Sequence, residues 1–185
     1  MGRPRGFDEV TVVRAAAELF STRSYDGISM DELVTHLGVH RNSLYKTFGS
    51  KRGLYQAALS WSLEHDVNPL IDRIAATGDL AEALRVAAAE PAAEVGLNLL
   101  LLAAVERAPV DREVADRLAA VLAAFDQAAR AASGSEGTED DLAFALTAAV
   151  LGLRMRARAG TAGTDIDRAG AALARRLTNH HHQGA

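Results

Sequence analysis

Apolar residues recur with a helical period along almost the whole chain, and the clearest pattern lies between residues 29 and 38. Four apolar positions there are spaced i, i+3, i+4 and i+7, which places them on one face of a helix: Met30, Leu33, Val34 and Leu37. Ser29 and Glu32 have the S-x-x-E spacing of a capping box, so we expect this helix to begin at Ser29. Gly38 follows the last periodic residue, where a left-handed backbone would end the helix.

A second helix is predicted from about His40 to Thr47. Leu44 and Phe48 are four residues apart and would face inward, and Val39 would fill the gap between the two helices. The outward face then consists of hydrogen-bonding groups: Arg41, Asn42, Ser43, Tyr45, Lys46 and Thr47. Such a pair matches the helix-turn-helix that inserts its second helix into a DNA major groove. An ordinary amphipathic pair with a solvated face is the alternative, because this geometry also occurs in proteins that bind no DNA.

The pattern on both sides of this segment is also helical. An acidic start and a broad apolar face predict a first helix from about Asp8 to Phe20. We expect Ser50 to cap the next helix, which continues to about His65 before Asn68-Pro69 breaks or kinks it. Further helices are predicted near 70–76, 79–89, 92–107, 111–132, 139–159 and 166–178.

Composition agrees with an all-α protein, since aromatic residues make up 5% of the 185 positions and only four prolines interrupt the chain. The absence of cysteine rules out disulfides and cysteine-ligated zinc. No apolar run reaches the roughly 18–20 residues of a membrane-spanning helix. We therefore expect a soluble, cytoplasmic protein with no membrane partner. The whole chain has a net charge of −4, but residues 1–62 hold eight Lys and Arg against six Asp and Glu. This positive N-terminal region would face the phosphates of a nucleic acid.

Residues 8–55 resemble the N-terminal domain of the tetracycline-repressor (TetR, or TetR/AcrR) family of bacterial transcription regulators. The resemblance rests on AAAELF at 15–20, on YDGISMDELVTHLGVHRNSLYKTFGSKRGL at 25–54, and on their order and spacing. One departure is His40, where a small capping Ser or Thr is common in the family, and it makes the base preference less predictable.

The resemblance implies an N-terminal three-helix DNA-binding domain followed by a helical ligand-binding and dimerisation bundle. It also implies a homodimer formed by the last two helices, a double-stranded operator and a small-molecule effector. We therefore interpret the chain as a ligand-responsive repressor that binds a palindromic operator as a dimer. The alternative is a helical small-molecule-binding or adaptor protein without DNA-binding activity. The predicted units are a DNA-binding domain at 1–50 (flexible arm 1–7, helix-turn-helix 29–48), a regulatory and dimerisation domain at 51–178, and a disordered tail at 179–185.

Arg41, Asn42 and Lys46 are the candidates for reading base edges, since Arg and Lys pair with guanine and Asn with adenine. Candidates for fixing the register on phosphates are Ser29, Ser43, Tyr45, Thr47 and Lys51. His40 is a further candidate for DNA binding, without an assigned partner. A lysine at a helix start opposes the helix dipole, which favours a phosphate partner for Lys51 over a stabilising role. Arg3 and Arg5 of the arm fit an A·T-rich minor groove, or else belong to a disordered tail.

Polar or aromatic residues within otherwise apolar helices are candidates for lining an effector pocket, with core packing as the alternative for each: Trp61, His65, Glu94, Asn98, Phe125, Phe144 and Met155. Arg154, Arg156 and Arg158 could pair with acidic neighbours, or one could hold an anionic effector. No G-x-S-x-G, P-loop or H-E-x-x-H motif occurs, so we expect no enzyme and no cofactor. His180 to His182 are interpreted as part of the tail and not as a metal site.

Overall fold

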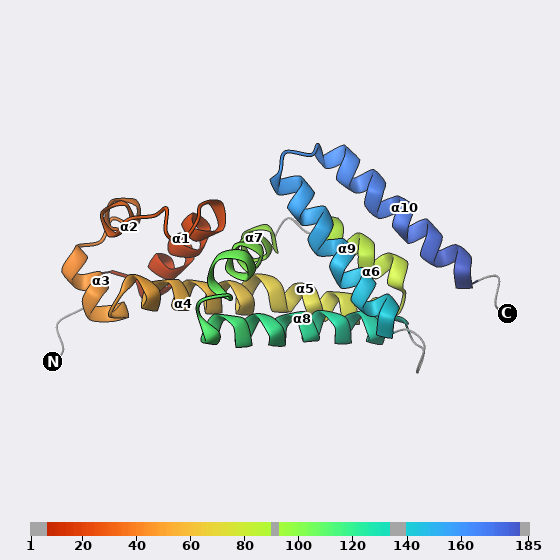
Figure 1. Ribbon diagram of the computed structural model, residues 1–185, viewed down its shortest axis with the longest axis horizontal. Coiled ribbons are helices and arrows are strands. Elements are labelled where there is room, and N and C mark those ends of the chain that lie inside the picture. The colour runs from red at the N-terminus through yellow and green to blue at the C-terminus, as the bar shows by residue number, and fades with distance from the viewer. Residues whose placement is uncertain (1–6, 90–92, 134–139, 182–185) are drawn as a thin grey trace.

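The computed structural model describes residues 7–89, 93–133 and 140–181, and within these ranges it contains helices and no β-strand. Helices α1 to α3 lie at one end of an elongated molecule and α10 at the other (Figure 1). None of the described helices combines the length and apolar composition needed to span a lipid bilayer. The elements are α1 (Glu9–Thr22), α2 (Met30–Leu37), α3 (Arg41–Phe48), α4 (Lys51–Ser62), η1 (Leu63–Val67), α5 (Asn68–Ala75), α6 (Leu80–Ala89), α7 (Glu94–Leu102), η3 (Ala103–Arg107), α8 (Arg112–Ser133), α9 (Asp140–Arg158) and α10 (Gly163–His181).

Local sequence signals set the starts of the first helices. The Asp8 carboxylate accepts a hydrogen bond from the Thr11 amide and so caps α1. Ser29 and Glu32 form the predicted capping box of α2, in which each side chain accepts from the other residue's amide. Gly38 ends α2 with φ +63°, a left-handed conformation that a residue without Cβ adopts at little cost.

Helices α4 and α5 form one continuous rod across Pro69, joined by the π-helical turn η1. In Figure 1 the rod runs horizontally, just above α8. Pro69 has no amide hydrogen and cannot donate to the carbonyl four residues before it. The widened turn just before it, in which the Asn68 amide donates to the Leu63 carbonyl, carries the helix past this position. The predicted interruption at Asn68-Pro69 is therefore a change of helical pitch and not a break.

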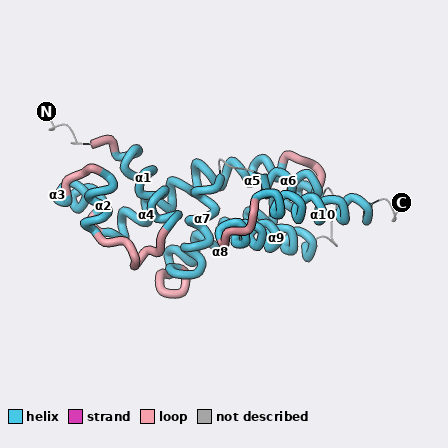
Figure 2. Tube along the Cα trace, turned by 90° about the horizontal axis from the view of Figure 1, so that it is seen from above, coloured by secondary structure: helices cyan, strands magenta, loops and turns pink. Residues whose placement is uncertain are grey.

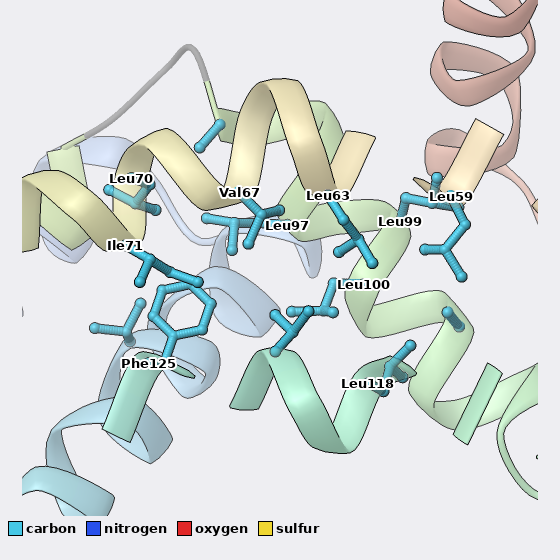
Figure 3. Close-up of a cluster of buried hydrophobic side chains, with 14 of the residues drawn as sticks. Leu59, Leu63, Val67, Leu70, Ile71, Leu97, Leu99, Leu100, Leu118 and Phe125 are labelled. Carbon is cyan, nitrogen blue, oxygen red and sulfur yellow. The ribbon is translucent and has the colours of Figure 1, made fainter. Parts of the chain in front are cut away.

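The hydrophobic core of the C-terminal part lies between this rod, α7 and α8. Leu97 and Leu99 are fully buried, as the nearly all-round apolar character of α7 predicts. Figure 3 shows Leu97 pointing toward Val67 of the rod and Phe125 of α8 pointing toward Ile71. The core is therefore closed by side chains at the centre of the molecule.

Two predicted boundaries differ from the structure. The helix predicted at 92–107 consists of α7 and a second π-helical turn, η3, directly before Pro109. The helix predicted at 166–178 extends from Gly163 to His181, so residues 179–181 belong to α10 and not to the predicted tail. The helical pattern weakened there because the last turn is polar, and a helix that packs over most of its length does not need an apolar final turn. Residues 182–185 lie outside the described part of the chain.

Gly96 lets α7 lie closely against η1. A Cβ at this position would stand 2.7 Å from Asp66 Cβ and 2.9 Å from Val67 Cγ2, well inside van der Waals contact. Asp66 Cβ is attached directly to the backbone, so a side-chain rotation cannot make room for the added atom.

We expect Gly96→Ala to destabilise the protein. Overpacking costs about 1–3 kcal/mol, whereas the higher helix propensity of alanine stabilises by only about 1 kcal/mol. Gly163→Ala is the control, since a Cβ there meets nothing within 4 Å. Thermal unfolding followed by circular dichroism measures both. A melting temperature for Gly96→Ala at or above that of the unchanged protein would show that α7 and η1 are not in close contact.

Candidate nucleic-acid interface

Helix α3 presents a polar face to solvent while its apolar residues hold it in place. Leu44 is 2% exposed and Val39 is 8% exposed, so both belong to the core as predicted. Phe48 is half-buried and packs against the same core. The predicted outward residues Arg41, Asn42, Tyr45, Lys46 and Thr47 are all exposed, Ser43 is half-buried, and His40 is exposed at the start of the helix. The arrangement is that of a recognition helix with one anchored and one free face.

Arg41 is the one predicted base-reading residue with an ion pair within the described part of the chain. Its Nη2 lies 3.2 Å from Oδ1 of Asp31 on α2, and the two side chains are 50% and 84% exposed. Such an exposed pair contributes little to stability because water and salt screen it. Asp31 can therefore hold the guanidinium loosely and release it to another acceptor.

The start of α3 carries no side-chain cap. His40 occupies the N-cap position without a side-chain hydrogen bond to the helix, which is the consequence of the departure noted at this residue. The first amides of α3 thus lack the partner that Ser or Thr would supply, although the Ser43 and Leu44 amides donate to the His40 carbonyl.

Ser29 is engaged in the capping box of α2, which stiffens the helix in front of α3. The Ser29 amide, the Arg23 guanidinium 2.9 Å away and the Ser29 hydroxyl together lower the pKa of Glu32 to about 2. The carboxylate therefore stays ionised throughout the neutral range, and the capping box persists there.

Lys51 has an intramolecular partner that the sequence did not indicate. Its ammonium donates to the Tyr25 carbonyl and lies 4.1 Å from the centre of the Tyr25 ring. Burial lowers the pKa of Lys51, which agrees with a half-buried position. The helix-dipole argument considered only α4 and missed the carbonyl and ring on the chain segment before α2, so the prediction against a stabilising role was wrong.

An aromatic cluster lies behind these contacts. Tyr25, Tyr55 and Phe20 meet at centroid distances of 5.0 to 6.1 Å, two of the pairs edge to face. Burial raises the pKa of both tyrosines above the ordinary value. The cluster joins the end of α1 to α4 and so fixes the base on which α2 and α3 rest.

A charged network that the sequence did not reveal ties the start of α4 to the start of α8. Arg52 Nε and Nη2 lie 2.8 and 3.0 Å from the two oxygens of Asp111, whose side chain is 5% exposed. This bidentate guanidinium lowers the pKa of Asp111 far below its ordinary value. No local spacing connects Asp111 with Arg52, 59 residues earlier.

The seven effector candidates do not meet in one pocket. Phe125 is a core residue, whereas Phe144 and Met155 are 68% and 56% exposed on α9. His65 is exposed and stacks on Trp61, with centroids 4.6 Å apart. Glu94 is exposed and Asn98 is half-buried on α7. Polar residues in apolar helices were thus poor indicators of a shared cavity, because they point in several directions. Arg3 and Arg5 lie outside the described residues.

An apolar cavity of about 130 Å³ does occur between α6, α9 and α10, and none of the seven candidates lines it. One charged residue, Arg176, stands among its otherwise apolar lining: Leu80, Leu84, Leu142, Ala145, Leu146, Ala149 and Leu173. Ala145 and Ala149 of α9 have small side chains, which leave the space that forms this cavity.

Helix α9 also carries an exposed apolar face. Phe144, Ala148, Gly152 and Met155 are all exposed, and their spacing places them along one side of the helix. Figure 2, seen from above, places α9 and α10 at the end of the molecule opposite α3. Leu173 of α10, 42% exposed, adds to the apolar surface of these last two helices.

Residues 12–58 match the sequence model of a family described as bacterial regulatory proteins, tetR family. Two similar relatives are the uncharacterized HTH-type transcriptional regulator YezE of Bacillus subtilis (strain 168), 35% identical over 121 residues, and the HTH-type transcriptional repressor BdcR of Escherichia coli (strain K12), 38% identical over 71 residues. The matches cover 62% and 38% of this chain. They span 62% and 36% of the relatives' own lengths, so less than two thirds of each relative is matched.

Among solved structures, the fold is similar to that of a cysteine mutant of the TetR family transcriptional regulator CifR complexed with a 26bp double-strand operator DNA. The TM-score is 0.78 at 24% identity, with 95% of this chain and 100% of the CifR chain covered. This likeness concerns the fold. It confirms the predicted all-α architecture with an N-terminal helix-turn-helix.

Proposed function

We propose that the chain is a transcriptional regulator of the tetR family that binds duplex operator DNA through α3; the match of residues 12–58 to the family model and the similar fold support this. The observation that carries this proposal is the exposed polar face of α3 above a buried Leu44. Arg41, Asn42 and Lys46 read base edges in the major groove. Ser29, His40, Ser43, Tyr45 and Thr47 contact phosphates, and Lys51 contributes by holding the Tyr25 segment behind them.

Repression is the mode of regulation that we propose. One similar relative is named a transcriptional repressor, and the matched fold was solved on a 26bp double-strand operator. Two copies of α3 held about one helical turn apart, roughly 34–36 Å, would read two half-sites of a palindrome. The rival is a helical small-molecule binder or adaptor that has no affinity for DNA.

Replacing Arg41 with alanine should weaken binding to the preferred duplex by about 1–3 kcal/mol and relax the base preference at one position of each half-site. The duplex is obtained by selection from a random-sequence library, and affinity is measured by gel shift across a salt series. Arg85→Ala is the matched control, since Arg85 is a 55% exposed arginine of α6, at the other end of the molecule from α3 (Figure 1).

Equal losses on the selected duplex and on random DNA would contradict a base-reading role for Arg41. Failure of the unchanged protein to bind any duplex at low salt would favour the small-molecule binder or adaptor.

We also propose that α9 and α10 form the interface of a homodimer. The exposed apolar side of α9 supports this, because an apolar surface of this kind on a small protein is usually covered by a partner. The small residues Ala148 and Gly152 on that side permit a second helix to approach closely. A two-fold arrangement would place the same side of α9 from each copy in contact.

Phe144→Asp should weaken the dimer about tenfold or more, because burying a phenylalanine contributes about 1.5–3 kcal/mol and an unpaired carboxylate in its place adds a further cost. Light scattering coupled to size exclusion over a concentration series measures the change. Val105→Asp, at a 69% exposed valine of η3 on another surface, is the control. A dimer that tolerates Phe144→Asp as well as Val105→Asp would place the interface elsewhere.

We further propose that the cavity between α6, α9 and α10 holds the effector, a small apolar molecule with an anionic group. The lining supports this, since it is apolar except for Arg176, whose charge suits a carboxylate. A volume of about 130 Å³ resembles apolar cavities of about 150 Å³ that hold a benzene ring. Because the cavity lies beside the exposed side of α9, a ligand there could change the proposed dimer and so the spacing of the two α3 helices.

Benzoate and hexanoate should raise the melting temperature, whereas benzyl alcohol and hexanol should do so less. Ala149→Phe should abolish this effect by filling the cavity, and Arg176→Gln should remove the preference for the carboxylates. Ala119→Phe, at an exposed alanine of α8, is the control. A shift that survives Ala149→Phe would show that the ligands bind at another site.

A further inference from the structure

The segment from the last turn of α1 to Tyr25, residues 21–25, is held by charged side chains from two distant elements of the C-terminal part. One is Arg158, the last residue of α9, and the other is Glu106 of η3. They lie 137 and 81 residues from their partners in this segment. Both contacts end on backbone atoms, so neither depends on the side chains of residues 21–25.

Arg158 supplies the C-terminal end of α1 with a cation. Its Nη1 donates to the Ser21 carbonyl at 2.6 Å and its Nη2 donates to the Thr22 carbonyl at 3.2 Å. The last carbonyls of a helix lack intrahelical partners and carry the negative end of the helix dipole. The last turn of α1 itself contains no basic residue, so a guanidinium from α9 takes the place that a local Lys or Arg would have.

Glu106 binds the other end of the same segment. Its Oε2 accepts a hydrogen bond from the Tyr25 amide at 2.9 Å. The neighbouring Arg107 lies over the Tyr25 ring, 4.4 Å from its centre, and makes the same kind of cation–π contact as Lys51 of α4. The widened turn of η3 thus directs two consecutive side chains at one residue.

Three polar attachments therefore supplement the packing of α1 on α4 and α7: Arg158 on the end of α1, Glu106 on Tyr25, and Arg52 with Asp111 at the base of α4. Apolar packing tolerates small rotations of one helix on another, and directional contacts at separate points restrict them. Arg158 is an exposed residue, and exposed charged contacts add little to the free energy of unfolding. A geometric role thus fits it better than a stabilising one.

We infer that Arg158 and Glu106 are positioning residues, which fix the orientation of α1 to α3 relative to α9 and thereby the separation of the two α3 helices in a dimer. This inference rests on the proposed DNA binding and dimerisation for its functional consequence, but the orientation itself is a property of one chain. The helix that we propose as the dimer contact is then attached directly to the first helix of the DNA-binding domain, without passing through α4.

Electron paramagnetic resonance tests the orientation without DNA. The chain has no cysteine, so Thr35→Cys on α2 and Ala120→Cys on α8 place two spin labels at exposed positions. Dilution with unlabelled protein removes signals between subunits. Arg158→Gln and Glu106→Ala should broaden or shift the distance distribution, and Arg158→Lys should restore part of it. Arg156→Gln, at an exposed arginine in the same last turn of α9, should leave it unchanged.

A distance distribution in Arg158→Gln and Glu106→Ala identical to that of Arg156→Gln would overturn the inference, whatever happens to the melting temperature. A change in melting temperature alone would indicate a merely stabilising role.

The functional consequence is measured with duplexes in which the two half-sites of the selected operator are moved apart or together by single base pairs. The unchanged protein should prefer one spacing, and Arg158→Gln should flatten that preference, with affinity at the best spacing reduced about two- to thirtyfold. Equal loss at every spacing would contradict positioning. If the unchanged protein bound no duplex, the proposed function would fail, while the spin-label distances would still decide the inference.

Discussion

Burial of the rod formed by α4, η1 and α5 is the constraint on which the rest of the structure depends. Its apolar face packs against α7 and α8, and the fit at Gly96 is so close that no Cβ can be accommodated there. Interiors this closely packed transmit displacement because few voids absorb it. The same rod begins at Lys51, shortly after α3 ends at Phe48. The packing of the core therefore determines the position of α3 and its polar face.

Charged contacts supplement this packing where the DNA-binding domain meets the remainder of the molecule. Most involve backbone atoms or a nearly buried carboxylate, as at Tyr25 and Asp111. Hydrogen bonds of this kind are directional, so they restrict orientation in a way that apolar contact does not. The side chains of α3 that we propose for DNA contact are exposed, apart from the half-buried Ser43, and the ion pair of Arg41 is itself exposed. Anchoring and recognition are thus divided between different residues.

The candidate site was predictable where it depends on local spacing and not where it depends on distant contacts. The polar face of α3 was predictable from the sequence. Once Leu44 is taken as buried, the helical period tells which of its neighbours face the core and which face solvent. Lys51 was misread because its partner belongs to another segment, and the helix-dipole argument is purely local. The effector candidates failed to converge because composition tells which residues are unusual in a helix but not where they point, as the exposed Phe144 and the buried Phe125 illustrate.

The amino-acid sequence by itself determined the helices, their caps at Asp8, Ser29 and Ser50, the turn at Gly38 and the family resemblance, because each depends on residues a few positions apart. Only the tertiary structure decided that Arg158 meets Ser21, that Arg52 meets Asp111, and that a cavity opens between α6, α9 and α10. Such contacts depend on the rotation and crossing of whole helices, which is set by the summed packing of many side chains and has no counterpart in local spacing.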